Sequence, residues 1–189
     1  MKFAIVGHSY VRHLQQVFPS FLTVDKVDIE CSFFGFSGAK YSTLVANDKF
    51  ISDLKTCDPD FVLIILGGND FSTQLSLTTV KDHCLLFYQK LRSWLPRAKI
   101  IASQVELRWY QEHNKFETPF GIDYNYQRKY LNRFLHKLKL KDFLFRVDGT
   151  SRLDNKALYV DAVHLNKKGL EKLVSLIKGG LSYWLAHSR

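Results

Sequence analysis

The chain has 189 residues, of which 46% are hydrophobic and 14% are aromatic. This composition excludes a disordered or low-complexity protein, and the length predicts a single domain spanning residues 1–189 with a sizeable core. Lysine and arginine number 27 against 18 aspartate and glutamate residues, which gives a net charge of +9. An excess of that size permits an anionic partner but does not require one.

The sequence has no segment typical of a membrane or secreted protein. Its longest apolar stretch, from Phe61 to Leu66, is far shorter than the roughly 20 residues of a membrane helix. The apolar stretch at residues 3–6 is too short for a signal peptide. Cys31, Cys57 and Cys84 are widely spaced, which is typical of reduced thiols. We therefore expect an intracellular protein, either cytoplasmic or nuclear.

Strand-like and helix-like stretches alternate along the chain. In chain order the pattern predicts a strand at 3–6, a helix at 11–18, a strand at 24–34, a helix at 41–54, a strand at 61–66, a helix at 79–95 capped by Thr79, a strand at 99–103, a helix at 124–140, a strand at 143–147 and a helix at 167–178 capped by Asn166. This alternation predicts an α/β sandwich with a parallel sheet, in which functional residues gather at the carboxyl ends of the strands.

Three short stretches fall at such strand ends. Residues 7–9 (Gly-His-Ser) open a helix, whose amino end favours negative charge developing near Ser9. Residues 35–38 (Gly-Phe-Ser-Gly) and 67–70 (Gly-Gly-Asn-Asp) contain glycines that let backbone N–H groups approach a ligand, and Asn69 can donate to an oxyanion. Taken singly, the three stretches also fit a helix cap and two ordinary turns.

A fourth stretch, residues 161–166, places Asp161 three residues before His164 and just ahead of the last helix. The carboxylate can fold back onto one ring nitrogen and leave the other free to act as a base. A single pair of this kind also occurs in ordinary surface loops. Together, the four stretches supply a nucleophile, oxyanion donors, an orienting carboxylate and a base at one edge of a sheet.

With these four stretches in this order, the sequence resembles the SGNH (GDSL-like) hydrolase superfamily. The resemblance implies a flavodoxin-like three-layer α/β/α sandwich with a parallel five-stranded sheet, and ester hydrolysis without a metal or organic cofactor. It implies Ser9 as the nucleophile, His164 as the general base and Asp161 as the residue that orients the base. The backbone N–H groups of Ser9 and Gly38 and the side chain of Asn69 would form the oxyanion hole.

The chain departs from the family at His8, where the family usually has Asp. The departure leaves the implied triad intact, but it changes the hydrogen bonding and acidity available at the site. The octapeptide from Gly7 to Leu14 also resembles SGNH domains of invertebrate proteins, including the esterase domain in first-frame proteins of some non-LTR retrotransposons.

Other residues leave alternatives open. Ser37 also lies between a strand and a helix and is a rival nucleophile, although Ala39 replaces the last glycine of a nucleophile elbow. No metal-ligand spacing of histidine or cysteine occurs, so no metal site is expected.

An aromatic segment at residues 105–121 supplies candidate substrate contacts. Arg108, Trp109 and Tyr110, together with His8, could contact a sugar, an acyl chain or an anionic group. The same rings could instead pack the loop against the protein.

The strongest local charge feature is residues 128–141, which hold six cations and no carboxylate. Within it, Lys129, Arg133 and Lys137 are spaced four residues apart on one face of the expected helix. That face is either simply solvated or in contact with a nucleic-acid backbone or an acidic membrane.

Two functions are compatible with these features. The first is a serine esterase that hydrolyses a small acyl ester, with acetyl among the candidate groups. The second is a weakly active or inactive adaptor of the same fold whose basic surface binds nucleic acid or an acidic membrane.

Overall fold

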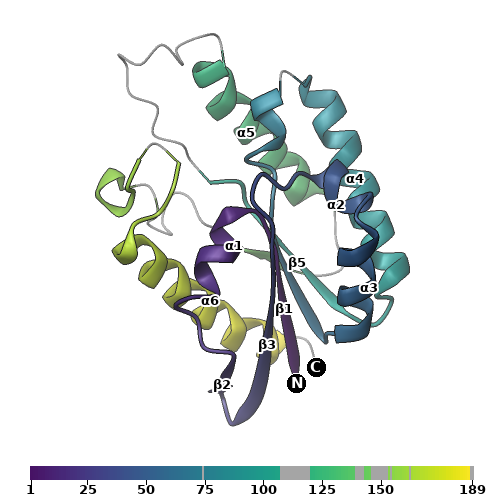
Figure 1. Cartoon of the computed structure of the whole chain (residues 1–189), viewed down its shortest axis with the longest axis vertical. Helices are drawn as coiled ribbons and strands as arrows, with labels where there is room; N and C mark the ends of the chain where they lie inside the picture. Colours follow the sequence, from purple (N-terminus) through teal and green to yellow (C-terminus); the bar gives the residue numbers. More distant parts are fainter. Residues whose placement is uncertain are drawn as a thin grey trace.

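The computed structural model describes residues 1–73, 75–106, 120–138, 143–145, 153, 155–161 and 163–187. Its centre is a six-stranded sheet in the order β2-β3-β1-β4-β5-β6 (Figure 1). The strands are β1 (Lys2–Gly7), β2 (Phe21–Val24), β3 (Val27–Gly35), β4 (Phe61–Ile65), β5 (Lys99–Ser103) and β6 (Phe143–Phe145). The five strands from β3 to β6 run parallel, which confirms the predicted fold, and β2 pairs antiparallel with β3 at the edge.

The edge strand β2 was not predicted, because residues 24–34 were expected to form one continuous strand. The chain instead makes a hairpin in which Val24 pairs with Val27. The two turn residues, Asp25 and Lys26, have φ angles of 50° and 67°. Positive φ at both positions gives a tight turn whose twist suits a hairpin, but the usual sequence signal is Asn-Gly or Asp-Gly. An Asp-Lys turn carries no such signal.

Helices cover both faces of the sheet (Figure 1). On one face lie α1 (Ser9–Leu14) and α6 (Lys167–His187), and on the other lie α2 (Tyr41–Val45), α3 (Asp48–Cys57), α4 (Leu77–Trp94) and α5 (Phe120–Lys137). Strand β4 is buried along its whole length, as its sequence predicts. Val62 and Ile64 pack toward α2–α5, whereas Leu63 and Ile65 pack toward α1 and α6.

Several helices begin or end at other residues than predicted, because the sequence alone does not show which of several possible capping residues is used. Ser76, and not Thr79, caps α4, since its hydroxyl accepts the Thr79 N–H at 3.1 Å. The helix expected at 41–54 is two helices, because Asn47 caps a second one. Asn166 caps α6 as predicted, but this helix continues to His187.

The parallel register brings three strand ends together. Gly7, the last residue of β1, pairs with Gly35 of β3 and with Ile65 of β4. A Cβ atom on Gly7 would lie 2.3 Å from the Ile65 carbonyl oxygen, and one on Gly35 would lie 2.4 Å from the Arg12 backbone nitrogen. Glycine at both positions therefore lets α1 pack directly on this edge, where the loops after β1, β3 and β4 meet.

Candidate active site

Ser9 is the first residue of α1 and is half-buried at this edge of the sheet. It does not cap the helix: the cap is His8, whose Nδ1 accepts the Tyr10 N–H at 3.4 Å. Within the described residues, no hydrogen bond joins the Ser9 hydroxyl to His164 or to another group. In unliganded sites the bond between nucleophile and base is often long and shortens when substrate binds.

Asp161 and His164 form a hydrogen-bonded pair. Asp161 Oδ2 lies 2.8 Å from His164 Nδ1, and Asp161 Oδ1 accepts the backbone N–H groups of His164 at 2.7 Å and Val163 at 2.6 Å. Desolvation raises the pKa of the Asp161 carboxyl, but the hydrogen bonds from the ring and the two N–H groups outweigh it and hold that pKa below its usual value. Asp161 is therefore ionised near neutral pH, and His164 Nε2 is the nitrogen left to accept a proton.

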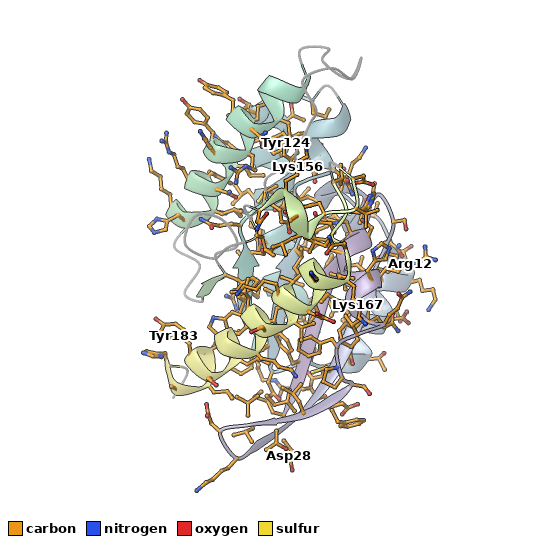
Figure 2. All side chains as sticks on the ribbon, turned by 90° about the vertical axis from the view of Figure 1, so that its left-hand side faces the viewer. Arg12, Asp28, Tyr124, Lys156, Lys167 and Tyr183 are labelled. Carbon is orange, nitrogen blue, oxygen red and sulfur yellow. The ribbon has the colours of Figure 1, made fainter. Side chains whose placement is uncertain are left out.

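The loop that carries this pair is docked on α1. The Tyr10 hydroxyl donates a hydrogen bond to the Val163 carbonyl oxygen. The ring centroids of His13 and His164 lie 6.2 Å apart. Figure 2 shows the start of α6, marked by Lys167, beside the helix that carries Arg12. These contacts hold the Asp161–His164 pair against the helix that begins with Ser9.

The loops after β3 and β4 are hydrogen-bonded to each other. Asn69 Nδ2 donates to the Ala39 carbonyl oxygen at 3.2 Å, and Asp70 Oδ1 accepts the Tyr41 N–H at 3.2 Å. Gly38 has a φ of +71°, a conformation that favours glycine, and none of the described residues lies within 4 Å of where a Cβ would stand. Two of the expected oxyanion donors, Gly38 and Asn69, thus lie on loops that hold each other in place.

Asp70 is fully buried beneath these loops. Burial raises the pKa of its carboxyl to about 7, although the hydrogen bond from the Tyr41 N–H and the charge of Lys40 act in the opposite direction. Asp70 thus organises this loop through the Tyr41 N–H, and its protonation changes near neutral pH.

His8 was predicted to contact substrate, but it is buried inside the protein. It is only 3% exposed, and its Nε2 lies 3.8 Å from Oε2 of Glu106, whose side chain is 7% exposed. Glu106 was not among the predicted site residues, although a carboxylate just after a buried strand was the available signal. The other expected substrate contacts, Arg108, Trp109 and Tyr110, lie outside the described residues.

The rival nucleophile Ser37 is exposed, and its Oγ accepts a hydrogen bond from Arg12 at 3.2 Å. In the part of the chain that the structure describes, it has no hydrogen bond to a histidine. The same part of the chain holds no group of three or more His, Cys, Asp or Glu side chains that could bind a metal ion.

The basic face of α5 has the exposure that the sequence predicts, but the neighbouring cation Arg128 is buried. Lys129, Arg133 and Lys137 are exposed, as expected. Arg128 is not part of this face, because it is 5% exposed and donates to the Val105 carbonyl oxygen at 3.2 Å. No helix among the described residues is long and apolar enough to cross a membrane.

The sequence profile of the GDSL-like lipase/acylhydrolase family matches residues 5–172. The chain therefore belongs to this family. No curated protein matches the sequence.

Several solved structures share the fold. A GDSL-like lipase from Bacteroides thetaiotaomicron has a TM-score of 0.71 at 14% identity, over 96% of this chain and 88% of that one. The psychrotrophic esterase EstA from Pseudoalteromonas sp., inhibited by monoethylphosphonate, has a TM-score of 0.67 at 15% identity, over 98% and 99%. An acetyl xylan esterase, AlAXEase, has a TM-score of 0.66 at 16% identity, over 96% and 100%. These likenesses show the SGNH hydrolase fold.

Proposed function

We propose that the protein is a serine esterase that hydrolyses small acyl esters, with Ser9 as the nucleophile, His164 as the general base and Asp161 as the orienting carboxylate. The observation that carries the proposal is the Asp161–His164 hydrogen bond of 2.8 Å in a loop that Tyr10 fastens to the first turn of α1. Membership of the GDSL-like lipase/acylhydrolase family supports the reaction class.

In this mechanism, Ser9 Oγ attacks the ester carbonyl and His164 Nε2 takes the hydroxyl proton. The backbone N–H groups of Ser9 and Gly38 and the Asn69 amide stabilise the negative charge that develops on the carbonyl oxygen. His164 then gives the proton to the departing alcohol, which leaves an acyl group on Ser9. Water, deprotonated by His164, releases the acid and restores the serine.

The acyl group we propose is small, and acetyl is the first candidate to assay. The support is the fold, which an acetyl xylan esterase shares. The narrower likeness to esterase domains of retrotransposon first-frame proteins has no support beyond the octapeptide from Gly7 to Leu14.

The unpaired cysteines Cys31, Cys57 and Cys84 support an intracellular location. The span of the family match supports a single domain.

Hydrolysis of p-nitrophenyl acetate by wild-type protein and the Asp161→Asn variant tests this proposal. Asparagine keeps the shape of the side chain but favours the wrong imidazole tautomer, so kcat should fall by about 10⁴-fold. Asp82→Asn, the same change at an exposed position of α4, is the matched control and should leave kcat unchanged. Equal turnover by the wild type and Asp161→Asn, or no turnover by the folded wild type, would contradict the proposal.

We infer a second function for the exposed face of α5, binding of single-stranded nucleic acid. The specific observation is an aromatic cluster among its cations. Tyr126 is 57% exposed, its hydroxyl donates to Tyr130 Oη at 3.1 Å, and the two ring centroids are 4.7 Å apart. The Arg133 guanidinium lies 5.4 Å from the Tyr130 ring centroid. Exposed rings that stack on bases, beside cations that contact phosphates, are typical of single-strand binding surfaces.

Figure 2 shows side chains along one side of α5 projecting outward from the protein. Fluorescence anisotropy with a labelled single-stranded oligonucleotide should show binding that weakens steeply with salt. Changing Lys129, Arg133 and Lys137 to Gln should make the log–log salt slope shallower by up to about two, at about 0.7 for each lost phosphate contact.

The matched control changes three exposed lysines on other elements, Lys26, Lys55 and Lys178, to Gln. This control should lose little of the salt slope. No binding at low salt, or equal losses in both triple variants, would contradict the proposal. Binding to vesicles of acidic lipid but not to the oligonucleotide would also contradict it and would favour a membrane surface.

A further inference from the structure

The ends of β1 and β5 bring a histidine and a glutamate together inside the protein. His8 Nε2 lies 3.8 Å from Glu106 Oε2, and their side chains are only 3% and 7% exposed. Glutamate is almost never so deeply buried unless it has a partner. Neither residue has a role in the mechanism above, yet His8 directly precedes Ser9.

Three buried side chains of α5 hold the backbone beside Glu106. Asn132 accepts the Val105 N–H at 2.8 Å and donates to the Val105 carbonyl at 3.1 Å. Arg128 donates to the same carbonyl at 3.2 Å, and the Tyr124 hydroxyl donates to the Glu106 carbonyl at 3.0 Å. The carboxylate of Glu106 is therefore presented from a fixed stretch of backbone.

The contacts of His8 define which ring nitrogen carries the proton. Its Nδ1 accepts the Tyr10 N–H at 3.4 Å, so in the neutral ring the proton is on Nε2, the atom that faces Glu106. The ring also packs edge-on against the Tyr10 ring, with centroids 4.9 Å apart. The Glu106 carboxyl group offers an acceptor oxygen beside Nε2, which favours this tautomer, and the tautomer in turn lets Nδ1 cap the helix that begins with Ser9.

We propose that Glu106 and His8 are a positioning pair for Ser9. Glu106 fixes the tautomer and orientation of His8, and His8 holds the first turn of α1, which carries the nucleophile and its N–H group. This inference rests on the proposed esterase function. In this arrangement the helix cap is His8, at the position where the GDSL pattern has Asp. The carboxylate comes instead from Glu106, after the end of β5.

The tautomer can be read without any substrate. In protein labelled with ¹⁵N-histidine, long-range ¹H–¹⁵N spectra should show His8 as the neutral Nε2–H form, with His8→Asn identifying its signals. Glu106→Leu should shift His8 away from that form, Glu106→Gln should shift it less because the amide oxygen still accepts a proton, and the exposed control Glu171→Gln should leave it unchanged. An Nδ1–H tautomer in the wild type, or a spectrum unmoved by Glu106→Leu, would overturn the inference.

Kinetics with p-nitrophenyl acetate test whether the pair acts through Ser9. Glu106→Leu should lower kcat by about 10- to 100-fold with little change in KM, as expected for a displaced nucleophile, and Glu106→Gln should recover part of the loss. Asn is a good helix cap and has no tautomer to fix. In a His8→Asn background, Glu106→Leu should therefore cause no further loss.

An equal effect of Glu106→Leu in both backgrounds would overturn the positioning role. If no variant or wild-type protein shows Ser9-dependent turnover while the tautomer behaves as expected, the esterase proposal fails, and the catalytic role of the pair fails with it.

Discussion

The Tyr10 hydroxyl donates a hydrogen bond to the backbone carbonyl of Val163, a residue 153 positions further along the chain. This bond joins the first turn of α1 to the loop that holds Asp161 and His164. The relative placement of the candidate nucleophile and base therefore depends on a contact between the two ends of the sequence.

Tyr10→Phe removes this bond and keeps the ring. We expect kcat to fall about 10-fold, because small displacements of catalytic groups cost up to about 100-fold in rate, and the free energy of unfolding to fall by about 1 kcal/mol. Tyr126→Phe, which also removes a hydroxyl that donates to a neighbour, is the control on α5 and should leave kcat unchanged. A Tyr10→Phe enzyme with wild-type kcat would show that the bond does not position the loop.

Asn69→Ala should lower kcat by about 10²- to 10³-fold, the usual loss when one oxyanion donor is removed, and losing its hydrogen bond to the Ala39 carbonyl oxygen should cost about 1 kcal/mol of stability. Asn47→Ala is the matched control, because it removes the cap of α3 and should cost a similar amount of stability, about 1 kcal/mol, without an effect on kcat. Steady-state kinetics and urea unfolding of both variants separate the two effects. A change in kcat below about threefold for Asn69→Ala would place its amide outside the oxyanion hole, given the size of that loss.

Asp70 predicts a dependence of stability on pH. Its pKa is raised from 3.8 to about 7 by burial, so the folded state binds the proton more tightly than the unfolded state. The stability from this group is complete below about pH 4 and is lost as the pH rises through about 7. Asp70→Asn, which can still accept the Tyr41 N–H, should flatten the change in unfolding free energy between pH 5 and 8. Parallel wild-type and variant curves from urea unfolding would contradict this assignment.

Two glycines of α6 predict opposite effects of the same substitution. A Cβ atom on Gly169 would lie 2.2 Å from the Leu158 carbonyl oxygen, whereas no described residue lies within 4 Å of a Cβ on Gly179. Gly169→Ala should therefore destabilise the protein by about 1–3 kcal/mol, and Gly179→Ala should stabilise it by about 0.5–1 kcal/mol. Thermal unfolding of both variants is the measurement, and shifts of the same sign would show that the helix packs differently here.

The sequence predicted the elements whose signals are local. The strand at 99–103 coincides with β5, and the apolar stretch at 61–66 contains β4, because buried parallel strands are apolar on both faces. The β2–β3 hairpin was missed because its turn, Asp25-Lys26, lacks glycine. Local spacing likewise predicted that Asp161 lies next to His164, which the 2.8 Å contact confirms.

Contacts between distant parts of the chain could not be predicted. Glu106 reaches His8 only because β5 and β1 end at the same edge, with β4 between them. Arg128 belongs to the cation-rich stretch at residues 128–141, but it is buried because it binds the Val105 carbonyl, 23 residues away along the chain. The Tyr10–Val163 hydrogen bond is another contact between distant parts of the chain. Periodicity places a side chain on a face of a helix, but it does not identify what that face meets.

The most direct measurement of the central claim is covalent labelling by a fluorophosphonate probe, with the modified residue located by mass spectrometry. We expect the wild type and Ser37→Ala to be labelled at Ser9 at equal rates. Ser9→Ala should be folded, unlabelled and inactive on p-nitrophenyl acetate, because Ser9 is a small residue at the start of α1 whose hydroxyl makes no hydrogen bond within the described residues. Labelling of Ser9→Ala at the wild-type rate, or a label on Ser37, would contradict the assignment of Ser9 as the nucleophile.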